Sequence, residues 1–199
     1  QNQKTYKFGV LVPRDHNHAM ELNQQNGDTR WYDAEKLEHS QLEEYDTFID
    51  KGDKIRTLDG YKKIRVHFVH GVKHDGRRKA RLVASGHLTD APTYSIYSGV
   101  VSLKGIRLAA FLAELNLLST WTTDIGNAYL EAKTKQKVYI VAAPPKTSEL
   151  ENHLFIINNA LYGLRSSGLR WHEKLADTLG DMGFVPSKGE NDIWMQRNG

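Results

Sequence analysis

The segment Asp124–Leu130 carries the residue types and the spacing in this chain that best suit chemistry. A carboxylate follows an apolar stretch, Gly126 allows the backbone to turn closely, and an aromatic ring follows at Tyr129. Such an arrangement can hold a magnesium ion on the carboxylate and set a flat ring beneath a bound substrate. The same pattern is also typical of an ordinary turn, in which Tyr129 would be a half-buried core residue.

A block of basic residues runs from Lys51 to Arg81. It contains eleven Lys and Arg residues and only three Asp. The net charge of +3 does not by itself indicate a nucleic-acid-binding protein, but this local excess suits a surface that faces phosphates. The alternative is a solvated hairpin with cations along its edge. Because side chains alternate along a strand, Lys79 and Arg81 would share one face.

The composition limits the class of protein and its compartment. The 199 residues include no cysteine, so a disulfide framework and a zinc knuckle are both excluded, and the chain suits a reducing environment. We therefore expect it in the cytoplasm or the nucleus. No apolar run approaches the roughly eighteen residues of a membrane span, so we expect no membrane partner.

Predicted helices and strands are interleaved along the chain and must position these residues. This order indicates an α+β or α/β class. Apolar periodicity predicts helices at 29–48, 105–118 and 168–182, of which the second, apolar nearly all round, should be buried. Turn and strand signals predict a hairpin at 64–68 and 77–84, and further strands at 121–125, 138–142 and 154–157. Residues 1–27 are interpreted as a poorly packed linker or lead-in segment.

Four motifs occur in a fixed order along the chain: Lys79–Ala84, a helix that begins at Gly105, Asp124–Leu130 followed by Val138–Ile140, and Ala160–Arg165 followed by Trp171. In this order they resemble the reverse transcriptases of copia-type retrotransposons, which are RNA-directed DNA polymerases. The likeness covers about residues 61–194. It implies an α+β, right-hand polymerase fold in which residues 28–199 form the fingers and part of the palm, with an antiparallel sheet packed on helices.

The resemblance also implies roles for single residues. Asp124 would be the catalytic carboxylate that binds two Mg²⁺ ions, with the carbonyl of Ile125 as a further metal ligand. Lys79 and Arg81, with Arg78 as an alternative, would bind the triphosphate of the incoming nucleotide. Tyr129 would exclude the 2′-hydroxyl of a ribonucleotide by its bulk.

The loop that contains Tyr162 and Gly163 resembles the family's second substrate-side motif, which packs on the nucleotide and the template. Tyr162 stands where many retroviral relatives have glutamine, and Arg165, beside a glycine turn, suits contact with a phosphate. A solvated arginine in a loop before a helix is the alternative for Arg165.

The family's adjacent aspartate pair is absent, because no two aspartates are adjacent anywhere before the last residue, Gly199. We therefore expect a fragment that is inactive alone and lacks the remaining palm, the thumb and the RNase H domain. The expected partners are an RNA or DNA template with its primer and deoxynucleoside triphosphates. Two other hypotheses remain open: a degenerate or domesticated nucleic-acid-binding module without chemistry, and an unrelated α/β domain.

Overall fold

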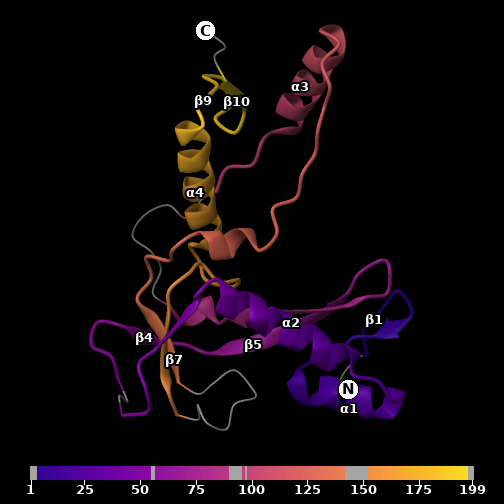
Figure 1. Ribbon diagram of the computed structural model, residues 1–199, viewed down its shortest axis with the longest axis vertical. Helices are drawn as coiled ribbons and strands as arrows, with labels where there is room; N and C mark the ends of the chain where they lie inside the picture. Colours follow the sequence, from indigo (N-terminus) through magenta and orange to yellow (C-terminus); the bar gives the residue numbers. More distant parts are fainter. Residues whose placement is uncertain (1–3, 55–56, 90–95, 97, 142–151, 197–199) are drawn as a thin grey trace.

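The computed structural model describes residues 4–54, 57–89, 96, 98–141 and 152–196. One lobe holds the N-terminal helices and most of the strands, and an arm formed by α4, β9, β10 and α3 extends away from it (Figure 1). None of the helices in these ranges combines the length and the apolar character needed to cross a membrane. The helices are α1 (His16–Asn26), α2 (Arg30–Glu44), α3 (Leu103–Leu115) and α4 (Ser167–Asp181). The strands are β1 (Tyr6–Lys7), β2 (Val10–Leu11), β3 (Phe48–Asp50), β4 (Lys62–Lys63), β5 (Val66–Val72), β6 (Arg78–Ala84), β7 (Val138–Val141), β8 (Leu154–Ile157), β9 (Phe184–Pro186) and β10 (Trp194–Gln196).

The hairpin β5–β6 has the alternation that the sequence predicts. Its strands pair antiparallel from Val66 opposite Ala84 to Val72 opposite Arg78, and the turn between them contains Gly76 at φ +80°, a conformation that favours glycine. The side chains of Ala80, Leu82 and Ala84 are buried on the face that packs on α2. The prediction that the opposite face carries Lys79, Arg81 and Val83 is therefore confirmed.

The second sheet has the strand order β3–β8–β7–β4. The strands predicted at 138–142 and 154–157 are confirmed as β7 and β8, although residue 142 lies outside the described residues. The expected antiparallel pairing is confirmed from β3 through β7 and is wrong at the edge, where β4 runs parallel to β7. The mixture of helices and sheets confirms the α+β class, whereas the right-hand polymerase fold stays a prediction.

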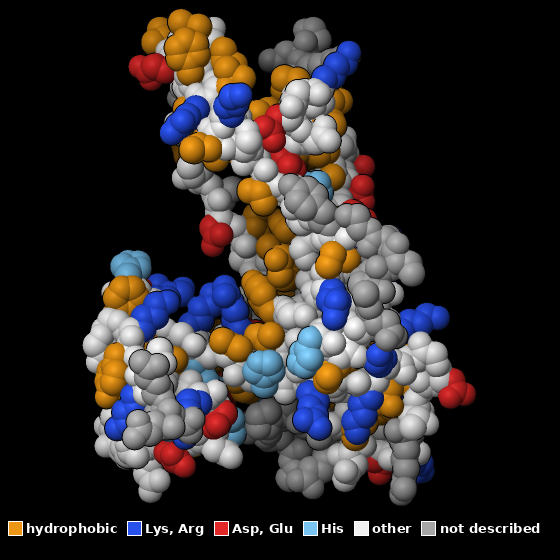
Figure 2. Space-filling view, turned by 180° about the vertical axis from the view of Figure 1, so that it is seen from behind, with side chains coloured by type: hydrophobic (Ala, Val, Ile, Leu, Met, Phe, Trp, Pro, Cys, Tyr) orange, Lys and Arg blue, Asp and Glu red, His pale blue; other side chains and the backbone are white. Residues whose placement is uncertain are grey.

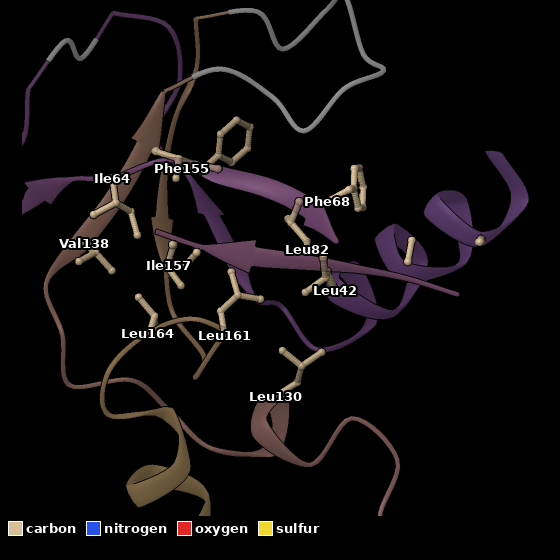
Figure 3. Close-up of a cluster of buried hydrophobic side chains, with 14 residues drawn as sticks. Leu42, Ile64, Phe68, Leu82, Leu130, Val138, Phe155, Ile157, Leu161 and Leu164 are labelled. Carbon is tan, nitrogen blue, oxygen red and sulfur yellow. The ribbon is translucent and has the colours of Figure 1, made fainter. Parts of the chain in front are cut away.

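One apolar core joins the β5–β6 hairpin and the four-stranded sheet to α2 and to the loops that carry the candidate site (Figure 3). Leu82 of β6 and Ile157 of β8 are each 1% exposed. Leu130, Leu161 and Leu164 come from the two loops and are buried in the same cluster. Because packed cores resist displacement, these leucines fix the two loops relative to the hairpin.

The prediction of a poorly packed segment at residues 1–27 is wrong for α1. Asp15 begins this helix by accepting a hydrogen bond from the backbone N–H of His18 at 2.9 Å, and Gly27 ends it in the left-handed conformation. Ala19 and Leu22 are buried with Trp31 of α2. Two small or medium apolar residues gave too weak a periodicity to predict this packing from the sequence. The start of the polymerase domain at residue 28 stays a prediction.

Helix α3 is present where it is predicted, but the prediction that it is buried is wrong. Ser102 begins it by accepting a hydrogen bond from the N–H of Gly105 at 3.0 Å, and Gly105 is its one buried residue. Phe111 is 61% exposed, and the neighbouring leucines are similarly open. In Figure 1 the helix stands at the far end of the arm, away from the core. An apolar sequence indicates a tendency to be covered but does not say which surface covers it.

The strand predicted at 121–125 does not form, so Asp124 does not end a strand. In the part of the chain that the structure describes, this segment has no ladder partner, and Trp121 is 92% exposed. Figure 1 shows why, since the chain after α3 descends beside the arm instead of joining the β5–β6 hairpin or the four-stranded sheet. Strand-like residues need a neighbouring strand to accept their backbone hydrogen bonds.

The helix predicted at 168–182 is confirmed as α4, which is shifted by one residue. Ser167 is its first residue, and its hydroxyl donates to the carbonyl of Leu161 at 2.7 Å. Gly183, at φ +86°, follows its last turn. Trp171 and Leu175 are only half-buried, so the apolar stripe of α4 is partly open.

The contrast between the core and α3 gives a stability prediction. Leu82→Ala should lower the free energy of unfolding by about 2 to 5 kcal/mol, because it leaves a cavity in a packed core. Phe111→Ala should change it by about 0.5 kcal/mol or less, because Phe111 is mostly in water already. Urea unfolding of both variants of the 199-residue chain measures the difference. Equal destabilisation by the two substitutions would mean that α3 is covered.

Candidate active site

The outer face of the hairpin carries two cations side by side. Lys79 lies opposite Gly71 and Arg81 lies opposite Val69, so small or apolar neighbours leave both cations accessible from one side. Partial burial lowers the pKa of Lys79, and the charges of Arg81 and Lys73 lower it further. The neighbouring cations also favour an anionic ligand at this face, because an anion relieves their mutual repulsion.

Asp124 interacts with this cationic face from the segment that descends from α3. Its carboxylate raises the pKa of Lys79, opposing the effects of burial and of the neighbouring cations. Asp124 and Ile125 are both exposed. The structure thus places the candidate metal ligand and the candidate triphosphate ligand within electrostatic range of each other. Figure 2 shows the basic side chains on the edge of the lower lobe, which faces the hollow beneath the α3 arm.

Glu38 of α2 lies on the other side of the hairpin and was missed by the sequence analysis. Its Oε1 accepts a hydrogen bond from the N–H of Leu82 at 2.9 Å. Burial raises the pKa of this carboxyl, whereas the bond to Leu82 and the charges of Arg81 and Lys79 lower it. Glu38 therefore supports β6 and partly offsets the charge of the two cations.

A stack of three side chains joins the hairpin to both loops. The guanidinium of Arg81 lies 4.7 Å from the ring centroid of Tyr162, which is a cation–π distance. The ring of Tyr162 in turn lies 4.9 Å from that of Tyr129, at an interplanar angle of 39°. Three residues that the sequence proposes for nucleotide binding therefore meet, although they are far apart along the chain.

Gly163 is needed for the loop to reach the hairpin. The carbonyl of Tyr162 accepts a hydrogen bond from the N–H of Ala84 at 2.7 Å, so the loop continues the end of β6. At Gly163 φ is +89°, and a Cβ built there would collide with the carbonyl oxygen of Ala84. A Cβ at Gly86 would likewise collide with the carbonyl oxygen of Gly163. Any larger residue at Gly163 would push Tyr162 away from Arg81.

Arg165 ties the same loop to the residues after β6. Its Nε donates to the carbonyl of Gly86 at 3.1 Å, and one terminal nitrogen lies 3.5 Å from the carbonyl of His87. The side chain is otherwise exposed. The geometry therefore gives Arg165 a structural contact that the sequence did not predict, and contact with a phosphate stays a prediction.

Asn159 positions Tyr129 and was also missed. The short 3₁₀ helix Ala128–Glu131 follows Asn127, whose φ is +51°, and its Leu130 is buried. The amide of Asn159 donates to the carbonyl of Leu130 at 2.8 Å and to that of Tyr45 at 2.7 Å. Its Oδ1 accepts from Lys133 at 2.7 Å. Since Asn159 is itself buried, this network holds the Tyr129 turn against α2.

The donor set fits part of a magnesium site. Asp124 and the carbonyl of Ile125 offer hard oxygen ligands in an open position, as Mg²⁺ requires. Among the described residues, no three His, Asp or Glu side chains come together as a metal-binding group. Asp124 alone therefore does not form a complete metal site. It is suited to share an ion with further carboxylates or phosphates.

The lowered pKa of Lys79 gives a prediction with a definite sign. A triphosphate bound on Lys79 would require the protonated amine, so affinity should be full below the pKa of the free protein and decline as pH rises through it. This decline should begin below the ordinary lysine value of 10.5. Lys79→Arg should bind without this decline, because arginine stays protonated. Titration of the chain with a fluorescent nucleoside triphosphate at several pH values measures it, and an identical decline in Lys79→Arg would contradict it.

Together these residues define a class of site. It combines cations, two tyrosine rings in contact and a single carboxylate on an α+β scaffold, and it suits a ligand with phosphates and a flat ring. The chain matches the family described as "Reverse transcriptase (RNA-dependent DNA polymerase)" over residues 53–199. It belongs to this family, and the resemblance to copia-type retrotransposon enzymes is confirmed.

Yeast transposon polyproteins are among the related proteins. The chain is 31% identical over 153 residues to the "Truncated transposon Ty1-A Gag-Pol polyprotein" of Saccharomyces cerevisiae (strain ATCC 204508 / S288c), which covers 75% of this chain and 13% of that protein. It shows the same identity to the Ty1-DR5 and Ty1-DR1 Gag-Pol polyproteins of that yeast, of which it covers 9% each. The chain thus spans a small part of the length of these relatives. No solved structure matches it.

Proposed function

We propose that this chain forms the nucleotide-binding side of an RNA-directed DNA polymerase that copies a template by adding deoxynucleotides to a primer. The observation that carries the proposal is the contact of Arg81 with Tyr162 and of Tyr162 with Tyr129, on the hairpin face that also carries Lys79. Asp124 supports it, because its charge raises the pKa of Lys79. Membership of the reverse transcriptase family supports it independently.

Each residue has a role that follows from its chemistry. Lys79 binds the triphosphate and neutralises negative charge on the leaving pyrophosphate. The Arg81 guanidinium, which lies over the ring of Tyr162, adds a second cation beside Lys79. Tyr129 lies beneath the sugar and excludes a 2′-hydroxyl. Gly163 keeps Tyr162 in place, and Arg165 binds either a phosphate or the loop alone.

Asp124 holds magnesium in this proposal, with the carbonyl of Ile125 beside it. Two such ions, when bound, stabilise the attacking and leaving oxygens of an in-line displacement. The family's aspartate pair is absent from this sequence, so we propose that residues 1–199 alone do not catalyse the reaction.

The wider context is also proposed. Residues 28–199 would form the fingers and part of the palm of a right-hand polymerase, completed by the remaining palm, a thumb and an RNase H domain. The partners would be an RNA or DNA template with its primer and deoxynucleoside triphosphates. A protein without cysteine that copies transposon RNA would act in the cytoplasm or the nucleus.

Primer extension tests the proposal. A longer protein that continues through an aspartate pair should extend a DNA primer on an RNA template in the presence of Mg²⁺, and residues 1–199 alone should not. Extension by residues 1–199 would show that the catalytic carboxylates are misassigned. Failure of the longer protein, with nucleotide binding retained, would favour the second candidate, a degenerate nucleic-acid-binding module, which the single carboxylate of the site also fits.

A further inference from the structure

The face of the β5–β6 hairpin that packs on α2 carries a concave surface near the turn of the hairpin. This surface encloses about 650 Å³ between the hairpin, α2 and β2, and its lining includes Val10, Ala34, Leu37, Arg77 and Arg78. We call it the tip pocket. Its first three residues precede residue 53, where the match with the reverse transcriptase family begins. In Figure 1, α2 and the short β1–β2 hairpin lie beside the end of β5–β6 that forms this pocket.

Arg78 is a central cation of the tip pocket. Because side chains alternate along β6, Arg78 lies on the face of Ala80, opposite the face of Lys79, so the pocket is separate from the candidate active site. The guanidinium carbon of Arg78 lies 5.3 Å from the ring centroid of Trp31 of α2. Its Nη1 donates to the carbonyl of Gly76 at 2.6 Å. These two contacts hold the cation in a defined orientation.

The charge of Arg78 is not matched by an anion in the part of the chain that the structure describes. Arg78 forms no ion pair there, and its Nε is buried without a hydrogen-bond partner. The carboxylates of the pocket already have other partners. Asp75 pairs with Arg77 at 2.7 Å, and Asp33 accepts a hydrogen bond from the hydroxyl of Thr29 at 2.8 Å. A ligand that brings a carboxylate to Arg78 would therefore supply the missing charge.

The tip pocket also has an apolar part next to this cation. Leu37 is 61% exposed, and it lies on the same side of α2 as Ala34, which is buried. Val10 of β2 is half-buried and lines the pocket with them. An apolar side chain of a ligand would be stabilised against Leu37, because both surfaces would leave water. The pocket thus offers an apolar contact beside an unmatched cation.

The balance of charge argues against a nucleic acid in this pocket. Three arginines line it, Arg30, Arg77 and Arg78, together with the two aspartates Asp33 and Asp75, which leaves an excess of one positive charge. Nucleic-acid strands bind along positively charged grooves, and their successive phosphates would meet both aspartates here. A peptide can instead present one carboxylate next to one apolar side chain, which matches the lining.

We propose that the tip pocket is a docking site for a short acidic segment of another protein, with a carboxylate of the segment on Arg78 and an apolar side chain against Leu37. The volume of about 650 Å³ lies within the range of pockets that hold small ligands, about 300 to 1,000 Å³, and therefore suits a short segment. Arginine and tryptophan are also the residue types that contribute most to binding at protein interfaces, and Arg78 lies against Trp31. The docking does not rest on the proposed polymerase function.

Selection of random 12-residue peptides displayed on phage against the 199-residue chain tests the proposal. The enriched peptides should carry aspartate or glutamate next to an apolar residue. Fluorescence anisotropy then measures the most enriched peptide, labelled, with each variant. Arg78→Gln should weaken binding about 10- to 100-fold, the usual effect of losing one hydrogen bond to a charged group. Leu37→Glu should weaken it by about tenfold or more, because it removes the apolar contact and repels the acidic peptide.

The matched control is Leu103→Glu, because Leu103 has the same exposed fraction as Leu37, 61%, but lies on α3 and does not line the pocket. It should change the affinity by less than about twofold, as expected for a distant site. Thermal melting should show that Leu37→Glu, whose native side chain is mostly in water, stays folded. The fluorescent nucleoside triphosphate should bind Leu37→Glu as it binds the native chain, so peptide docking and the proposed function are tested separately.

Four results would overturn the proposal. One is failure to enrich acidic peptides, and another is equal affinity of the native chain and Arg78→Gln for the enriched peptide. Equal losses in Leu37→Glu and Leu103→Glu would place the peptide on α3 or attribute its binding to net charge. Displacement of the peptide by oligo(dT) at lower concentration than by unlabelled peptide would identify a nucleic acid as the occupant.

Discussion

Replacing Asp124 by asparagine in a longer polymerase that continues through the aspartate pair is expected to reduce nucleotide incorporation by about 10³-fold or more. Asparagine keeps the size of the side chain but removes the charge that holds the metal ions. Loss of a single preorganised electrostatic contact in an active site costs about 10²- to 10³-fold, and a bridging metal ligand should cost at least as much. Single-turnover primer extension with saturating Mg²⁺ measures the effect.

The control for this prediction is Asp177→Asn, which removes an exposed carboxylate of α4 in the same way. It should keep the native rate within about twofold. Because Asp124 is exposed, its substitution should also leave the melting temperature unchanged, so a loss of activity cannot be explained by unfolding. Full activity of Asp124→Asn would show that another carboxylate binds the metal.

Tyr129→Ala in the same longer polymerase should change the choice of sugar more than the rate. The substitution removes bulk beneath the sugar and leaves the charged groups in place. We expect the preference for deoxynucleotides over ribonucleotides to fall by about 10- to 100-fold, equivalent to about 1.4 to 2.8 kcal/mol of lost discrimination. Incorporation of the matching deoxynucleotide should stay within about tenfold of the native rate.

Tyr129→Phe is the matched control, since it keeps the ring and its contact with Tyr162. It should select deoxynucleotides as the native protein does. Competition between labelled deoxy- and ribonucleoside triphosphates gives the ratio directly. An unchanged ratio in Tyr129→Ala would mean that Tyr129 is a core tyrosine, the alternative that the sequence left open.

The elements that the sequence predicts correctly depend on local signals. The hairpin β5–β6 follows from alternating residues on both sides of a Gly76 turn, and α4 follows from its apolar periodicity. The predictions that fail depend on tertiary partners. The exposure of Phe111 and the lack of a strand at 121–125 are set by the arm that carries them away from the core, and no local pattern encodes that arm.

The candidate site likewise contains residues that the sequence predicts and residues that it does not. Motif order predicts Lys79, Arg81 and Asp124, and strand alternation correctly places the two cations on one face. The supporting residues Glu38 and Asn159 were missed because a single polar residue carries no periodic signal. One signal was available for Glu38, since it stands four residues after Ala34 and four before Leu42, both of which are buried on α2.

The most direct test of the account is a crystal structure of the longer polymerase with primer–template, a non-hydrolysable deoxynucleoside triphosphate and Mn²⁺ in place of Mg²⁺. We predict anomalous density for the metal within coordination distance of Asp124, with the triphosphate on Lys79 and Arg81 and the sugar above Tyr129. Metal density away from Asp124, or a triphosphate bound on the α2 side of the β5–β6 hairpin, would contradict the account.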